Sequence, residues 1–239
     1  MSAAMISAHN DGKTGKSPNG SATPGRAAMK LYRLGGNNFD TRYSRAVLAD
    51  DAEPPIECPS CHRMLPRQPE KLQIAWISGR DENPLTEIGD FTWPCGLQFI
   101  VVRDDARITV AAAVPDAIFK KVEVVGIAQG SGRIHPADKT VTLPSSGLPL
   151  WWLTSEHVVH LDIDKSGRRP ENCCGRCGRC DWVVADNAPV VVPTSEFRGA
   201  TLFRVHEVGA PYFVTEPVAT WLLQQRFSNL QVKPAGFVA

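Results

Sequence analysis

The amino-acid sequence predicts an α+β fold that consists mostly of short antiparallel strands with few helices. From residue 30 onward, short runs rich in β-branched and aromatic residues recur, and each is bounded by Gly, Pro, Asp or Asn. Only two segments carry helical signals. Apolar residues make up 43% of the 239 residues and charged residues 21%, which is the composition of a globular protein able to bury a sizeable core.

The expected strands are distributed along the chain after residue 29. β-branched or aromatic residues dominate each of them, and turn-forming residues separate each from the next. The strands cover residues 30–34, 72–77, 98–103, 121–127, 140–143, 158–163, 182–184, 202–206, 212–215 and 230–233.

Two helices are expected between these strands. The segment 115–121 begins with Pro and Asp, which suit a first helical turn. The segment 216–227 repeats apolar residues at helical spacing. Thr215 can cap the start of this second helix, and Pro217 lies where a missing N–H costs little. The chain therefore closes with a strand–helix–strand unit.

Composition divides the chain into a tail and a body. Residues 1–28 are rich in Ser, Gly, Ala, Asn and Pro and show no apolar period, so we expect a disordered tail. Residues 29–239 are expected to form a single α+β domain, or two subdomains joined through the cysteine motifs described below. Met29 directly precedes the first strand and could itself be the natural start.

Charge and hydropathy restrict the partners. The formal net charge is +1, and the first 29 residues hold three basic residues and one acidic residue, so the remainder carries −1. A body so close to neutral lacks the broad basic face of most phosphate-backbone binders, which counts against nucleic acid as the main partner. The sequence shows neither an apolar stretch long enough to span a bilayer nor a secretory signal. We therefore expect a cytoplasmic protein with no membrane partner and with reduced thiols.

Two Cys-x-x-Cys motifs stand out among the seven cysteines. The first knuckle is Cys58-Pro-Ser-Cys61, and the second knuckle lies within residues 173–180. Two thiolates separated by two residues can face the same ion, and zinc prefers four such ligands in a tetrahedron. The pattern predicts one structural Zn²⁺ ion held by Cys58, Cys61, Cys174 and Cys177.

The second knuckle offers more than one ligand pair. Cys174 with Cys177 and Cys177 with Cys180 have the same spacing. We favour Cys174 and Cys177, because Gly178 then follows in the usual knuckle position. Adjacent Cys173 and Cys174 would not readily bind one ion. Whether Cys180 or Cys173 replaces a named ligand stays open at this point.

The two knuckles are far apart in the sequence. Between Cys61 and Cys174 lie 112 residues, so a zinc-ribbon-like pair of knuckles would enclose a large insertion. This is no thermodynamic obstacle, because loop closure costs only about 0.6 kcal/mol more for each doubling of length. Two alternatives are free thiols and a redox pair at Cys58 and Cys61. A redox pair normally lies at a helix N-terminus, and the flanking prolines do not favour a helix there.

Charged and titratable residues elsewhere are weaker candidates. Four arginines surround the second knuckle and could contact nucleic acid, but they would also offset the net −2 of a four-thiolate zinc centre. His157 and His160 lie three apart on an expected strand, hence on opposite faces, and His206 is expected to be an edge or core residue. The arginines are Arg168, Arg169, Arg176 and Arg179.

No catalytic residue is assigned. The sequence contains no Gly-rich phosphate loop, no nucleophile elbow and no His-Glu-x-x-His motif. We therefore expect a protein that is not an enzyme.

Several short motifs, taken in order, resemble one known family. That family is the double-CxxCG motif family of myxobacteria, which includes the Sit immunity proteins. His62 stands where the family's first motif has Gly, and Cys173 and Cys180 are additional. The matching segments are residues 31–34, 58–61, 89–94, 99–103, 174–179, 202–205, 213–216 and 228–230.

The resemblance implies an immunity protein, that is, an antitoxin that binds and neutralises a cognate polymorphic toxin by occlusion. The partner would be a protein toxin encoded by a neighbouring gene. Specificity is expected on exposed loops such as 81–90, whose carboxylates could face a basic toxin surface. The alternative, from another class, is a zinc-ribbon regulator that binds nucleic acid through the arginines near Cys177. A third reading is an enzyme without a recognisable motif.

Overall fold

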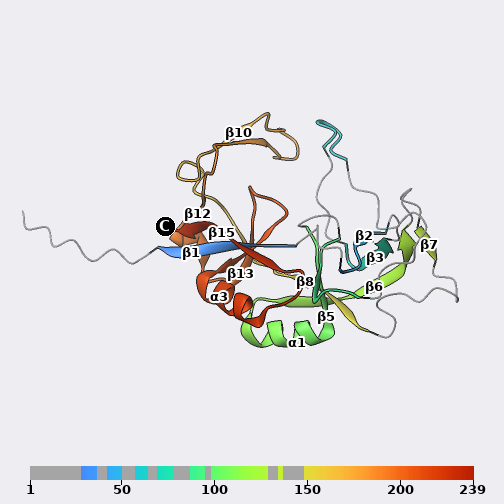
Figure 1. Ribbon diagram of the computed structural model, residues 1–239. Coiled ribbons are helices and arrows are strands. Elements are labelled where there is room, and N and C mark those ends of the chain that lie inside the picture. The colour runs from blue at the N-terminus through green and yellow to red at the C-terminus, as the bar shows by residue number, and fades with distance from the viewer. Residues whose placement is uncertain are drawn as a thin grey trace, which may run out of the picture.

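The computed structural model describes residues 28–36, 42–49, 57–63, 69–77, 87–94, 98–128, 134–136 and 148–239. Within these residues the chain is strand-rich, with two mixed sheets, a two-stranded ribbon and three helices, in keeping with the α+β class (Figure 1). The expected strand 140–143 and the expected tail, apart from residue 28, lie outside the described residues. None of the helices in the described part has the length and apolar character needed to cross a bilayer.

The first sheet has six strands, and β1 lies near its centre. Its neighbours β14 and β15 are both antiparallel to β1, and helix α3 (Glu216–Gln225) connects them in the chain. The two outer pairs, β12 with β15 and β9 with β13, are parallel. The order is β12 (Val190–Val192), β15 (Gln231–Val238), β1 (Met29–Gly35), β14 (Tyr212–Thr215), β13 (Leu202–Val205) and β9 (Val158–Val159).

Strands β12, β13 and β14 of this sheet are buried on both faces, which explains their nearly continuous apolar runs. Successive side chains point to opposite faces, so Tyr212 and Val214 belong to one core cluster and Phe213 to the other. Of the expected strand 158–163, only Val158–Val159 forms a strand.

The second sheet is organised around the long strand β6. The first part of β6 pairs with β8, and its second part pairs with β3 in parallel and with β7. The strands are β2 (Ala46–Leu48), β3 (Leu72–Ile77), β6 (Ile118–Ala128), β8 (Leu150–Thr154), β5 (Ile100–Arg103) and β4 (Phe91–Thr92), with β7 (Ile134–Pro136) beside β6.

The helix predicted at 115–121 is wrong, and a helix was missed just before it. Helix α1 (Asp104–Ala113) follows β5 directly, and β6 already begins at Ile118. Pro115 and Asp116 form a turn instead, because the Ala117 N–H donates to the Val114 carbonyl at 3.0 Å. The β-branched residues within α1 hid its helical signal.

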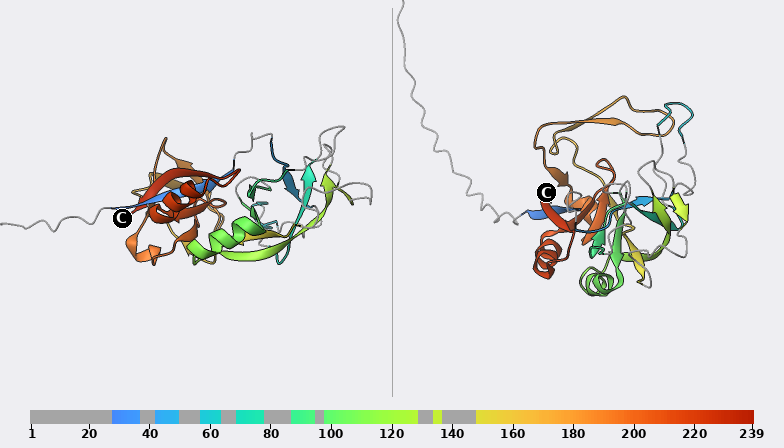
Figure 2. Two further views of the ribbon diagram at one scale, coloured as in Figure 1. Left: turned by 60° about the horizontal axis from the view of Figure 1, so that its bottom comes forward. Right: turned by 45° about the vertical axis from the view of Figure 1, so that its right-hand side comes forward.

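The predicted C-terminal helix is confirmed as α3, which ends at Gln225 because Arg226 adopts a left-handed conformation (φ 54°). Helices α1 and α3 lie on the same side of the molecule (Figures 1 and 2). Together with strands of both sheets they enclose one apolar cluster. A short helix, α2 (Thr194–Phe197), packs at the opposite face of the first sheet. The buried members of the shared cluster are Leu34, Phe91, Trp93, Ile100, Val102, Ala106, Val110, Val114, Leu153, Leu202, Tyr212, Val214, Val218, Ala219 and Leu222.

A separate antiparallel ribbon projects from the two sheets (Figures 1 and 2). It consists of β10 (Arg168–Glu171) and β11 (Asp181–Val184). The second knuckle forms the tip of this ribbon. The fold therefore presents residues 172–180 at the end of a two-stranded arm.

Candidate metal centre

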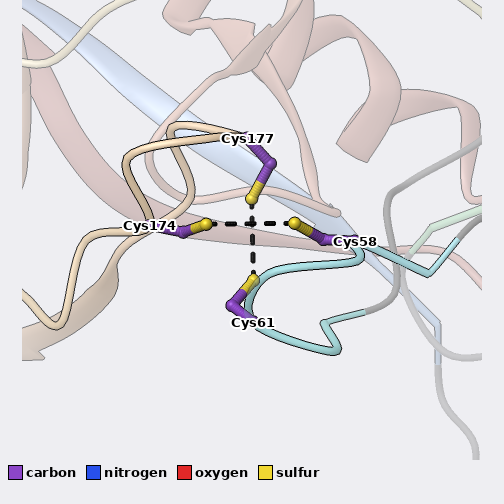
Figure 3. Close-up of side chains that lie close together, drawn as sticks. All are labelled: Cys58, Cys61, Cys174 and Cys177. Carbon is purple, nitrogen blue, oxygen red and sulfur yellow. Dashed lines mark hydrogen bonds between the residues drawn. The ribbon is translucent and has the colours of Figure 1, made fainter.

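The structure brings the four predicted cysteine ligands together. Their sulfur atoms all lie within 4.8 Å of one another, and Cys58 is buried while the other three are half-buried. Figure 3 shows the four side chains directed toward one point, two from the first knuckle and two from the ribbon tip. The group can hold a metal ion.

The sulfur separations fit a tetrahedral ion. Four sulfurs each about 2.3 Å from a central zinc are about 3.8 Å apart in an ideal tetrahedron. The Sγ atoms of Cys58 and Cys174 are 3.9 Å apart, and those of Cys61 and Cys177 are 3.7 Å apart. The spacing suits a four-thiolate site with no open coordination position.

The two knuckles share one backbone conformation. In the first, the Cys58 N–H donates to the Arg63 carbonyl at 2.9 Å, and the His62 N–H donates to the Cys58 carbonyl at 2.9 Å. In the second, residues 174, 178 and 179 repeat both bonds at the same 2.9 Å distances. The repeated hydrogen bonds indicate that both knuckles present their two sulfurs from the same kind of turn.

The fifth position of each knuckle needs a left-handed backbone. Gly178 has φ 71°, where glycine meets no steric penalty. His62 occupies the equivalent place with φ 57°, which a residue with a Cβ adopts at a cost of about 1 kcal/mol. Its Nδ1 atom lies 2.6 Å from Glu57 Oε1. His62 therefore adopts the same left-handed conformation as Gly178, and the first knuckle keeps the geometry of the second.

The thiols influence one another's protonation. Backbone N–H groups of Cys177 and Arg176 donate to the Cys174 sulfur and lower its pKa to about 6. N–H groups of Ser60 and Cys61 lower the pKa of Cys58. The Arg63 N–H would lower the pKa of Cys61 as well, but burial and the three neighbouring sulfurs outweigh it and raise that pKa to about 12. Four crowded thiols cannot all ionise together unless a cation balances them.

The additional cysteines of the second knuckle form a disulfide, so the expectation of reduced thiols is wrong for Cys173 and Cys180. Cys173 and Cys180 are bonded, with a sequence separation of 7, and their Cα atoms lie 4.0 Å apart. The bond closes the base of the ribbon tip and removes Cys180 from the alternative ligand pair with Cys177. The seventh cysteine, Cys95, lies outside the described residues.

An arginine that the sequence analysis overlooked joins the two knuckles. Arg63 donates to the carbonyls of Asn172 at 3.2 Å and Arg179 at 2.9 Å. It also forms an ion pair with Asp181 at 2.7 Å. The position of Arg63 directly after the first knuckle was the only hint of this role in the sequence. Its partners could not be predicted, because they lie 109 to 118 residues later in the chain.

The four arginines around the second knuckle differ in burial and in their partners. Arg169 pairs with Glu171 at 2.6 Å, and Arg168 is half-buried. Burial lowers the pKa of Arg168, and the charge of Glu207 opposes that effect. Arg179 also has an interaction partner, whereas Arg176 is exposed.

The acidic loop proposed for specificity is only partly described. Glu87 is exposed, while Asp81 and Glu82 lie outside the described residues. Asp90 is engaged internally, because its Oδ2 accepts the Ser228 N–H at 2.7 Å and the Ser228 hydroxyl at 2.8 Å. Trp93 Nε1 donates to the Asn229 carbonyl nearby at 2.9 Å. Asp90 therefore holds Ser228 in place and is not a free surface charge.

No protein-family model matches the chain, and no curated protein matches it significantly.

Proposed function

We propose that Cys58, Cys61, Cys174 and Cys177 hold one structural Zn²⁺ ion. The observation that carries this is the pair of sulfur separations, 3.7 and 3.9 Å, between segments 116 residues apart. Tetrahedral sites of four thiolates suit zinc or iron, and zinc is the ion that such closed sites use for structural purposes. The ion would supply the positive charge that lets all four thiols ionise.

Such a centre would hold the ribbon, not perform chemistry. The ion would join the first knuckle to the ribbon tip, and Arg63 already connects the same two segments through its hydrogen bond to the Arg179 carbonyl. All four coordination positions would be filled by protein, which leaves none for a substrate. The site therefore supports a scaffold role.

Elemental analysis tests the metal directly. Protein purified without chelator should contain about one zinc per chain and no iron. Cys58→Ser and Cys177→Ser should each reduce the zinc content, whereas the paired Cys173→Ser and Cys180→Ser variant should retain it. Iron in place of zinc, or retention of full zinc in Cys58→Ser, would contradict the assignment.

We further propose that the protein is an immunity protein that neutralises a cognate toxin by binding and occluding it. The support is the resemblance of its ordered motifs to the double-CxxCG family. In the fold these motifs meet in pairs: the knuckles contact each other, the stretch 89–94 contacts 228–229, and β1 pairs with β14. The motifs thus constitute the internal scaffold.

This arrangement is suited to a family that keeps one scaffold and varies its partner. Specificity would then lie on exposed segments outside the motifs, among which Glu87 is a described candidate. Occlusion needs an interface of about 1,200–2,000 Å² with a few desolvated anchors, and it needs no reactive group.

Co-expression with the toxin encoded by the neighbouring gene tests the function. Protection should follow the molar ratio of the two proteins and should fail with an unrelated toxin. Rescue far below equimolar amounts would replace occlusion with an enzymatic mechanism. Absence of binding to the toxin, together with a shift of DNA or RNA at physiological salt, would instead favour the zinc-ribbon regulator.

A further inference from the structure

A second group of metal-ligating side chains lies at the ends of two parallel strands. Strands β9 and β13 pair in parallel, with Val205 opposite Val159. The next residues, His206 and His160, therefore leave the sheet side by side, and the His206 N–H donates to the Val159 carbonyl at 2.9 Å. The two imidazole rings have centroids 5.0 Å apart.

The carboxylate of Glu207 completes the group. Its Oε1 lies 2.8 Å from His160 Nδ1 and 3.7 Å from His206 Nδ1. The Glu207 side chain is only 8% exposed, whereas those of His160 and His206 are 55% and 65% exposed. Glu207 Oε2 accepts the Leu161 N–H at 3.1 Å, which fixes the orientation of the carboxylate.

Glu207 is held in its charged form. Burial alone would raise its pKa, but the hydrogen bonds from His160 and from the Leu161 backbone outweigh burial, and the pKa is lowered. An ionised carboxylate beside two accessible imidazoles is a set of hard and borderline ligands, unlike the four thiolates of the first centre.

We propose that His160, His206 and Glu207 bind one divalent first-row transition-metal ion. Nitrogen and oxygen ligands about 2.0–2.2 Å from a common ion are roughly 2.8–3.6 Å apart at octahedral or tetrahedral angles. The observed 2.8 and 3.7 Å bracket this range, and the candidate ligand atoms all lie within 4.8 Å of one another. Small rotations of the exposed rings bring them into place.

The Leu161 backbone bond supplies the outer-shell support that metal-binding carboxylates have. Three protein ligands leave at least one coordination position to solvent. Arg168 opposes the cation, because its positive charge also interacts with Glu207. Its Nε atom is buried without a hydrogen-bond partner among the described residues. The affinity should therefore be lower than that of the four-thiolate centre.

His157 provides a matched control. It lies on the same segment as His160 and is similarly exposed at 47%, but its Nε2 contacts Asp116 Oδ1 at 3.2 Å, away from the cluster. His157 and His160 therefore have different partners, although neither lies within a strand as expected, since β9 contains only Val158–Val159. The partner of His160 is His206 instead, 46 residues later in the chain.

Titration of Ni²⁺ into untagged, full-length, zinc-loaded protein tests the site. Calorimetry should show one saturable equivalent of Ni²⁺ while the bound zinc is retained. His160→Ala, His206→Ala and Glu207→Gln should each weaken binding roughly tenfold or more, since loss of even an outer-shell partner costs about 10–100-fold. His157→Ala should leave the affinity unchanged.

A second measurement needs no substitution. In the wild-type NMR spectrum, substoichiometric Ni²⁺ should broaden the imidazole signals of His160 and His206 before those of His157. Absence of saturable binding, equal broadening at all three histidines, or wild-type affinity in His160→Ala and His206→Ala would overturn the assignment.

Discussion

Removal of the metal from the four-cysteine centre should destabilise the whole protein. The perturbation is either a strong chelator or the Cys177→Ser variant. Because the unfolded chain offers no preformed site, the free energy of metal binding contributes to folding. The sulfurs of Cys58 and Cys174 join positions 116 residues apart, so the ion acts as a long-range cross-link.

The magnitude follows from the length of the closed loop. In the chain-entropy treatment, a cross-link across a loop of that length stabilises the folded state by about 5 kcal/mol. For a chain of this size, 1 kcal/mol corresponds to about 2–4 °C in Tm, so the expected decrease is about 10–20 °C. The disulfide between Cys173 and Cys180 spans only 7 residues, and the same treatment gives about 2 kcal/mol for its removal.

Thermal unfolding followed by circular dichroism, with zinc content measured in parallel, is the assay. The Tm of the wild-type protein should decrease on chelation. The Tm of Cys177→Ser should already be lower by a similar amount and should not change further with chelator. The paired Cys173→Ser and Cys180→Ser variant should stay chelator-sensitive. If chelation removes all zinc and lowers Tm by less than about 2 °C, the cross-link reasoning is refuted.

Three further predictions follow from the described contacts. Gly236→Ala should reduce the free energy of unfolding by about 3 kcal/mol or more in urea titrations, because the new Cβ would lie 1.8 Å from the Val190 carbonyl oxygen; wild-type stability would contradict the β12–β15 pairing. Gly178→Ala has open space around its Cβ but keeps φ 71°, so the same titration should show a loss of only about 1 kcal/mol. Asp116→Asn should cost about 1–3 kcal/mol at pH 7, because Asp116 accepts two hydrogen bonds from Thr201. Burial would raise the pKa of Asp116, but the hydrogen bonds from Thr201 outweigh burial, and the pKa is lowered. The stabilisation that Asp116 provides is therefore present above about pH 4 and is lost as the pH falls through the folded-state pKa. Urea titrations at pH 7 and pH 3 should show that the stability difference between Asp116→Asn and wild type shrinks at pH 3.

Much of the strand content was predictable from local sequence, because apolar runs bounded by turn residues identify strands directly. Strands β1, β3, β13 and β14 lie where the residue pattern places them. The errors arose where one signal has two meanings. Pro115 and Asp116 suit a helix start and a turn equally well, and only the start of β6 at Ile118 decides between them.

The sequence by itself determined the chemistry of the candidate metal centre. A Cys-x-x-Cys spacing requires only a local turn to direct two sulfurs to one side, so each pair was readable from a few residues. The spacing alone could not decide whether Cys174 or Cys180 is the second ligand beside Cys177. The disulfide to Cys173 settles that choice in the structure, because it engages Cys180.

Only the tertiary structure decided which distant groups meet. Arg63 reaches Asp181 across the knuckles, and Asp90 holds Ser228. His160 stands beside His206 because β9 and β13 pair in parallel and in one particular register. Register and sheet order depend on how buried faces pack together over the whole chain. They cannot be predicted from a short window of neighbouring residues, because the packing partners lie far away in the sequence.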